Sequence, residues 1–146
     1  VLIILVIIVA GFVVGNVLTP SKTEKRGKTE FVILATGVDN RLADNIKPGD
    51  KGIISHESKA MVEVLTVEKK PSEIMILNEN KRAFEKAESQ LTTDLYITVT
   101  GEADVNDEKI QIDDVFVRVG ESIWVDSENL PVHGTIVQIN SDSKEW

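Results

Sequence analysis

Three oxygen-bearing side chains stand at alternate positions in the second half of the chain, at Asp104, Asn106 and Glu108. A calcium loop uses carboxylate and amide oxygens at its first, third and fifth positions. Here the sixth position, which is glycine in such a loop, is Lys109, and the twelfth is Val115 instead of glutamate. The acidic tip of a β-hairpin explains the same residues, and we favour that interpretation over a calcium site.

The other residues that could do chemistry do not form a site. His56 lies in a predicted turn and His133 at the start of a predicted strand, without a nucleophile or a ligand set nearby in the sequence. The absence of cysteine excludes disulfides, iron–sulfur clusters, thiol chemistry and cysteine-based zinc sites. We therefore expect no catalytic residue, cofactor, metal or small-molecule substrate. A cleft around Asp104, Asp113 or Asp114 is the residual place for an enzyme site.

The charged residues are confined to one part of the chain. The 146 residues include 16 basic and 24 acidic side chains, which gives a formal net charge of −8. Because phosphate binding needs clustered positive charge, this composition argues against nucleic acid as a partner. Residues 1–18 contain no charge at all. The chain thus divides into a hydrophobic segment and an acidic head.

Residues 1–19 predict a hydrophobic helix about 28 Å long at roughly 1.5 Å per residue, enough to cross the hydrocarbon core of a bilayer. Gly11 and Gly15 are spaced for close packing against a neighbouring helix. A lone membrane anchor and a helix that packs against copies of itself both explain this segment. The sequence starts at Val1, inside the hydrophobic run, which fits either a processed terminus or a missing upstream segment.

Residues 20–28 are polar and charged and predict a linker between the hydrophobic segment and the head. Pro20 ends the predicted helix, and Pro20 and Gly27 are the expected hinges of the linker.

The head contains two passages that match each other. Residues 29–37 align without gaps on residues 93–101, and both runs end in Thr-Gly. Further on, residues 46–50 correspond to residues 117–121, and each of these Gly-acid turns is followed by two β-type runs. Short strands separated by regular turn signals are typical of β-sandwiches and small barrels.

The expected fold class is therefore mainly β, with the hydrophobic helix followed by an all-β head of two related small barrel or sandwich halves. The halves cover residues 29–77 and 93–146. The segment between them, 78–92, is expected to be partly helical because its apolar residues recur at helical spacing. Turns or bulges are expected at five glycines: Gly37, Gly49, Gly101, Gly120 and Gly134.

Two smaller elements and a core complete the expected head. Residues 39–46 predict a short helix, and residues 102–114 predict a β-hairpin. The following residues are expected in the core: Phe31, Ile33, Ile54, Val64, Val67, Leu95, Ile97, Val99, Trp124, Ile136 and Ile139.

Several motifs come after the hydrophobic segment in a fixed order. A strand ends in Gly37-Val38, the run 46–50 reads Ile-Lys-Pro-Gly-Asp, and later come Val-Gly-Glu at 119–121 and Gly-Thr-Ile-Val-Gln-Ile at 134–139. Together they resemble an uncharacterised, domain-of-unknown-function family of single-pass bacterial membrane proteins. The resemblance covers most of the chain; it implies a single membrane-spanning segment and no particular activity.

The layout of the chain is also similar to type IV pilins and archaeal pilin-like filament subunits. In those proteins the hydrophobic helices bundle as the filament core, and the β-rich heads form the outer shell. The acidic residue near the start of many bacterial pilin helices is missing here, since residues 1–15 carry no charge. This is a likeness of layout and not of motif.

The function expected from the sequence is that of a non-enzymatic structural subunit of an extracellular pilus-like filament. Its partners would be copies of itself and, before assembly, the membrane. The alternative is a single-pass, membrane-anchored envelope protein whose β head is a protein-interaction module. Filaments in the purified protein would favour the first hypothesis, and a monomer in detergent would favour the second.

Overall fold

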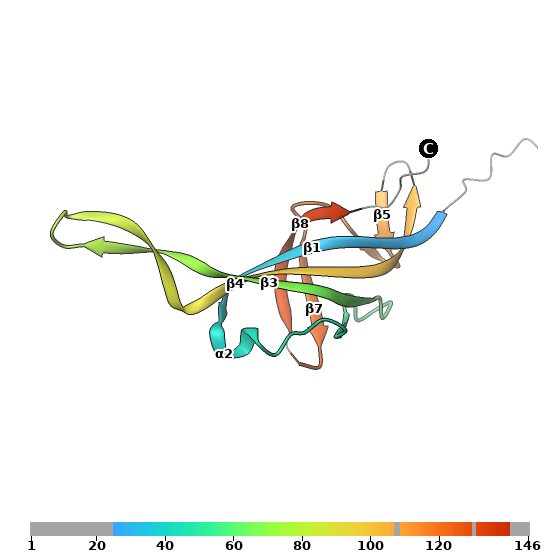
Figure 1. Ribbon diagram of the computed structural model, residues 1–146. Coiled ribbons are helices and arrows are strands. Elements are labelled where there is room, and N and C mark those ends of the chain that lie inside the picture. Colours follow the sequence, from blue (N-terminus) through green and yellow to red (C-terminus); the bar gives the residue numbers. More distant parts are fainter. Residues whose placement is uncertain (1–24, 107–108, 130, 141–146) are drawn as a thin grey trace, which may run out of the picture.

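The computed structural model describes residues 25–106, 109–129 and 131–140. These residues form one antiparallel sheet and one short helix (Figure 1). The elements are β1 (Lys25–Asp39), α2 (Asn40–Ala43), β2 (Lys51–Ile53), β3 (Met61–Asn78), β4 (Ala83–Asn106), β5 (Lys109–Ile112), β6 (Val115–Phe116), β7 (Ser122–Ser127) and β8 (Val132–Asn140). The prediction of an all-β head is confirmed.

The sheet closes on itself. Its strand order is β1-β8-β7-β2-β3-β4, with β5 and β6 continuing from β4, and β1 also pairs with β4. Six strands therefore form a barrel, which leaves no open edge around the ring. Alternate side chains of each strand point inward, so Phe31, Ile33, Leu95, Val99 and Ile136 are buried in the shared core.

Matching hydrogen bonds relate the two halves of the sequence within this barrel. The Gly49 amide donates to the Val64 carbonyl at 2.7 Å, and the Gly120 amide donates to the Ile136 carbonyl at 2.8 Å. The amides of Val64 and Ile136 donate back to the acidic residue after each glycine, at 2.8 and 2.9 Å. Exchanging β1, β2 and β3 with β4, β7 and β8 leaves the order of strands in the ring unchanged.

The expected fold class is nevertheless wrong about how the halves fold. Neither 29–77 nor 93–146 forms a barrel or sandwich of its own, because the strands of both halves are interleaved around one ring. Three strands cannot close a barrel, and an isolated set would expose two unpaired edges. Interleaving pairs those edges and lets both halves share one core.

The expected hydrophobic helix is not part of the fold that the structure shows. The only helix in the described ranges is the four-residue α2, and no helix among these residues is long and apolar enough to cross a membrane. Residues 1–24, including Gly11, Gly15 and Pro20, lie outside the described residues. The fold class is corrected to a single mainly β barrel.

The expected helix within residues 78–92 is also wrong. β3 and β4 continue past the barrel as a hairpin, in which Leu77 lies opposite Phe84 and Ile74 lies opposite Ala87. Phe84, Ala87 and Leu91 do have helical spacing. In the hairpin, however, Phe84 and Ala87 have cross-strand neighbours, and Leu91 lies among residues 89–92, which have no partner of their own in β3. Pairing with the apolar run at the end of β3 therefore overrides the local periodicity.

The linker expected at residues 20–28 is shorter than the sequence indicates. β1 begins at Lys25, and Gly27 pairs with Ala103 of β4. Gly27 therefore lies within a strand of the sheet instead of in a hinge.

The expected short helix in residues 39–46 is present as α2. The Asp39 carboxylate caps it by accepting a hydrogen bond from the Arg41 amide at 2.9 Å. The Arg41 guanidinium also donates to this carboxylate, and together these bonds lower the pKa of Asp39 to about 2.

Most of the expected core residues are buried or pack against the core, but Trp124 does not. β7 alternates, with Ile123 and Val125 facing inward, so Trp124 points outward and is 64% exposed. Because Ile123, Trp124 and Val125 are all apolar, the sequence does not show which of them face the core.

The five glycines fall into two groups. Gly37, Gly49 and Gly120 have positive φ angles of 68°, 93° and 91°. Gly101 and Gly134 instead lie inside β4 and β8, where a Cβ would come within 2.8 Å of a side-chain atom and 2.6 Å of a backbone oxygen, respectively. These two glycines therefore permit close packing and do not form turns.

Candidate functional site

The most prominent feature outside the barrel is a β-hairpin, residues 73–88, which we call the arm. It consists of the end of β3 and the start of β4, paired from Glu73 opposite Glu88 to Asn78 opposite Ala83. Figure 1 shows the arm as the long extension on the left, at the far end of the molecule from the start of β1. Along the arm the two strands pair with each other and, among the described residues, with no third strand.

The arm exposes large apolar side chains on both of its faces. Residues directly opposite each other in an antiparallel pair share a face. Leu77 and Phe84 therefore lie on one face with Met75, whereas Ile74 and Ile76 lie on the other. These five side chains are between 42% and 68% exposed. Contiguous apolar surface of this kind marks an interaction site in soluble domains.

The charged side chains of the arm are largely paired with one another. Lys86 Nζ lies 2.8 Å from Glu73 Oε2, and Lys81 Nζ lies 2.7 Å from Glu85 Oε1. Asn78 also donates to Glu85 at 3.0 Å. These donors lower the pKa of Glu85, and the Glu73 carboxylate raises the pKa of Lys86. The surface of the arm that is available to a partner is therefore mainly apolar.

Polar contacts fix the root of the arm to the barrel. The Asp94 carboxylate accepts from the Ser72 hydroxyl at 2.6 Å and from the Gly37 amide at 2.9 Å. The Thr93 hydroxyl donates to the Lys70 carbonyl at 2.7 Å. Ser72 and Thr93 are both buried. The arm therefore starts from a rigid base and not from a loose loop.

A large bulge lies between the barrel and the arm. Four β4 residues, 89–92, stand opposite the single β3 residue Ser72. The Ser89 hydroxyl caps the bulge by accepting two backbone N–H bonds at 3.2 and 3.1 Å, and Asn40 of α2 donates to the Gln90 carbonyl at 2.8 Å. Bulges bend a strand and change the direction of the residues beyond them, so this one sets the direction of the arm.

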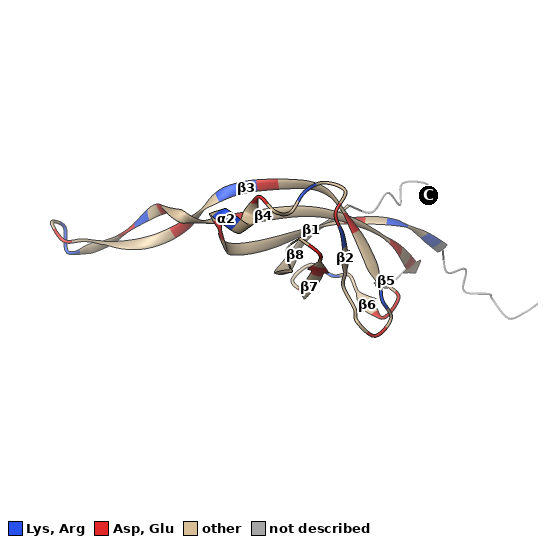
Figure 2. Cartoon of the chain, turned by 90° about the horizontal axis from the view of Figure 1, so that it is seen from below, with Lys and Arg blue, Asp and Glu red and all other residues tan. Residues whose placement is uncertain are grey.

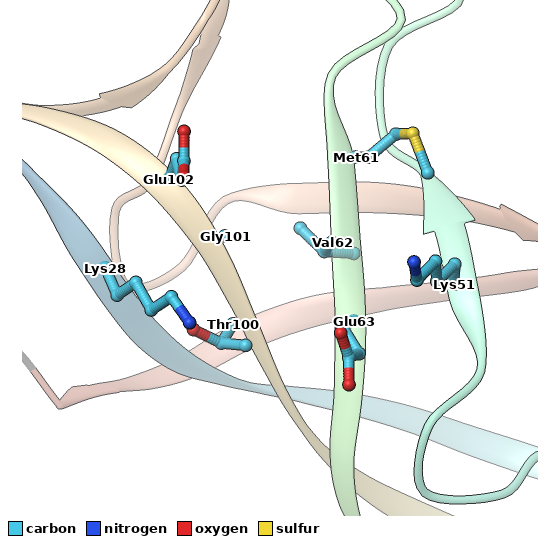
Figure 3. Close-up of a pocket in the computed structure, with 8 residues that line it drawn as sticks. All are labelled: Lys28, Lys51, Met61, Val62, Glu63, Thr100, Gly101 and Glu102. Atoms are coloured by element: carbon cyan, nitrogen blue, oxygen red, sulfur yellow. The ribbon is translucent and has the colours of Figure 1, made fainter.

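A shallow pocket on the barrel is a weaker candidate site. It has a volume of about 200 Å³. Figure 3 shows its lining residues: Lys28, Lys51, Met61, Val62, Glu63, Thr100, Gly101 and Glu102. Two cations and two carboxylates share this rim, so no one charge type dominates it. Gly101 has a packing reason to be glycine, since a Cβ there would lie 2.8 Å from Ile112 Cδ1.

The acidic and histidine residues singled out from the sequence do not converge. Asp104 accepts from Arg26 Nε at 3.0 Å, and residue 108 lies outside the described residues. His56 Nε2 is 3.5 Å from an Asp126 oxygen, whereas the His133 ring stacks on Trp124 with 4.4 Å between ring centroids. Within the described ranges, no three His, Asp or Glu side chains are grouped to hold a metal ion.

Asp114 has serine partners and no histidine partner. The hydroxyls of Ser55 and Ser58 both donate to its carboxylate, which lowers the pKa of Asp114. A nucleophilic serine needs a base to take its proton. Here both serines donate to a carboxylate that ties two loops together, which is a structural arrangement.

The fold and the arm together define a mainly β protein: a single barrel from which one apolar hairpin projects. The model of the family described as domain of unknown function (DUF4330) matches residues 1–140, and the chain belongs to this family. The expected membership of an uncharacterised family is thereby confirmed. No curated protein and no solved structure matches the chain.

The arm itself was missed by reasoning from the sequence, although a signal for it was present. Residues 74–77 are four consecutive apolar residues, and the polar run Asn78-Glu79-Asn80 comes directly after them. An apolar run, a polar turn and a second run that can pair with the first predict a hairpin. The helical spacing of the apolar residues after the turn favoured a helix over this hairpin.

Proposed function

We propose that this protein is a non-enzymatic, membrane-tethered interaction protein of the cell envelope, whose barrel presents the arm to a protein partner. The observation that carries this proposal is the arm, which exposes apolar side chains on both faces while most of its charges pair internally. The uncharged residues 1–18 would serve as the tether, since this is about the number of apolar residues that a membrane span requires.

The position of the arm supports a role away from the tether. Lys25, where β1 begins, pairs with Val105 near the end of β4, whereas the arm contains the start of β4. The chain from the hydrophobic segment therefore enters the barrel at the end opposite the arm (Figure 1). At about 3.3 Å per residue, the 24 residues of β4 span up to about 80 Å.

A protein fits the arm better than a lipid bilayer does. Both edges of a two-stranded ribbon carry unpaired backbone groups, and hydrocarbon offers no partner for them. A protein strand or groove can cover the apolar faces and pair with an edge at the same time. The polar residues singled out from the sequence pair with their neighbours instead of lining a cavity, which supports a non-enzymatic role.

The test compares two exposed aromatic positions in intact membranes. A photo-crosslinking residue replaces Phe84 on the arm in one variant and Trp124 on the barrel in the other; these side chains are 68% and 64% exposed. We expect protein adducts from the Phe84 variant and few from the Trp124 variant. Adducts to lipid alone, or equal adducts from both positions, would overturn the proposal.

A second candidate is the subunit of an extracellular pilus-like filament, assembled through the hydrophobic segment with the β heads outside. The uncharged run at residues 1–18 favours it, because so many aliphatic side chains need either lipid or copies of themselves to cover them. Electron microscopy of the purified full chain tests it. Filaments that are weakened by Gly11→Leu or Gly15→Leu would support this function, and dispersed particles would exclude it.

A further inference from the structure

We propose that the partner of the arm is the arm of a second copy of this chain, joined along the β3 edge in an antiparallel four-stranded sheet. This inference rests on the proposed function, because it names the partner of the same surface. Two observations support this inference: the two edges of the arm differ in their charged residues, and a two-fold symmetric pairing of the β3 edge brings apolar residues together.

The two edges of the arm differ in charge. The β3 edge presents four consecutive uncharged apolar residues, 74–77. The β4 edge carries Glu85, Lys86 and Glu88. Charged side chains on an edge strand oppose pairing with another strand, whereas an uncharged apolar edge invites it. The β3 edge is therefore the one open to an additional strand.

Two-fold symmetry restricts the register of this pairing. The axis must stand perpendicular to the sheet, so each residue lies opposite one of the same parity. With Met75 on the axis, Ile74 lies opposite Ile76 of the second copy and Glu73 lies opposite its Leu77. Over residues 71–79, no like charges meet in this register. Moving Ile76 onto the axis would place Glu73 opposite Glu79 of the second copy, and like charges directly opposite destabilise a sheet.

The apolar residues of the two arms complement each other in this register. Ile74 and Ile76 from both copies form one cluster on one face of the four-stranded sheet, and the two Met75 side chains meet on the other face. A two-stranded ribbon is marginally stable alone, whereas three or more strands with an apolar face are stable. Pairing therefore supplies the strands that each arm lacks.

The shape of the molecule accommodates this pairing. Figures 1 and 2 show the arm projecting beyond the barrel along the long axis of the molecule. In the register with Met75 on the axis, the tip of each arm lies beside Lys70 and Pro71 at the base of the other arm, so the two barrels lie at opposite ends of the four-stranded sheet. The two-fold axis also puts the two Lys25 ends at the same height, so both hydrophobic segments can enter one membrane.

Disulfide trapping tests the pairing directly, because the chain has no cysteine of its own. Directly opposed residues have Cα atoms about 4.5–5.5 Å apart, within the range for a disulfide. The full chain is prepared in detergent as Met75→Cys and as Phe84→Cys, two positions that are 59% and 68% exposed. We expect oxidation to link Met75→Cys into a dimer about tenfold more efficiently than Phe84→Cys.

Sedimentation of cysteine-free variants gives an independent measurement. Ile76→Lys introduces a charge at the centre of the β3 edge and should shift the full chain from dimer to monomer. Lys86→Gln on the β4 edge is the control and should leave the dimer intact. Circular dichroism confirms that each variant retains its β content.

Equal trapping at both cysteine positions, or a full chain that is monomeric without any substitution, would overturn arm-to-arm pairing. The proposed function has a separate outcome. If the photo-crosslinker at Phe84 still yields adducts to a different protein, the arm is an interaction site for another partner. If Phe84 yields no protein adducts and Met75→Cys gives no disulfide-linked dimer, both proposals fail.

Discussion

At the scale of single residues, the two Gly-acid turns hold the clearest trace of the repeat. Gly49 and Gly120 adopt φ angles of 93° and 91° and bond in the same way to the last strand of each half. A Cβ at either position would meet no atom within 4 Å. Any loss of stability from adding a Cβ at these positions would therefore come from the backbone conformation and not from a steric clash.

Gly49→Ala and Gly120→Ala should each lower the free energy of unfolding by about 1–2 kcal/mol, the usual penalty for a left-handed residue with a Cβ. Gly27→Ala is the matched control, because it also has open space but lies in an ordinary strand. Urea unfolding measures all three. A loss for Gly27→Ala as large as for the other two would contradict this explanation.

The sequence predicts residues well where one local rule decides their role. The turn glycines at 49 and 120 follow from turn chemistry, and Phe31, Ile33 and Val99 follow from apolar residues in alternating strands. The orientation of Trp124 does not follow, because its neighbours are equally apolar and only pairing with β8 fixes which side faces inward. The close packing at Gly134 against Leu34 is likewise visible only after folding.

At the scale of elements, the arm is where local pattern and long-range pairing disagree. Its second strand has helical spacing, but no helix forms because the apolar run 74–77 lies opposite it. The base of the arm depends on Asp94, Ser72 and Gly37, which are 22 to 57 residues apart in the sequence. No local rule connects residues at that separation.

Replacing residues 74–87 with Asn-Gly should remove the arm and leave the barrel folded. Glu73 and Glu88 are already paired, and Asn-Gly is the preferred two-residue hairpin turn. None of the side chains removed is buried in the core. The midpoint temperature of thermal unfolding should change by no more than a few degrees. Crosslinked adducts and dimers that depend on the arm should disappear. A barrel that fails to fold would show that the arm is structural.

At the scale of the whole molecule, the two related halves of the ring differ in charge. Acidic residues outnumber Lys and Arg in β5 to β7 and the turns between them, whereas the two charge types are nearly balanced from β1 to β3 (Figure 2). Interleaving brings strands of the two halves side by side, since β1 lies between β4 and β8. The repeat was visible in the sequence, but its interleaving was not, because equal strand patterns are compatible with separate or shared barrels.

The interleaved ring predicts that neither half folds alone. Within residues 25–92 the strands that remain paired are β2 with β3 and the arm hairpin, whereas β1 loses both neighbours. Residues 93–140 keep β7 with β8 and the end of β4 with β5 and β6, but β4 loses its pairing with β1 and β3. Each fragment should therefore unfold without a cooperative transition, and mixing the two should restore the cooperative transition of residues 25–140. A fragment of residues 93–140 that unfolds cooperatively by itself would show that the halves are independent domains after all.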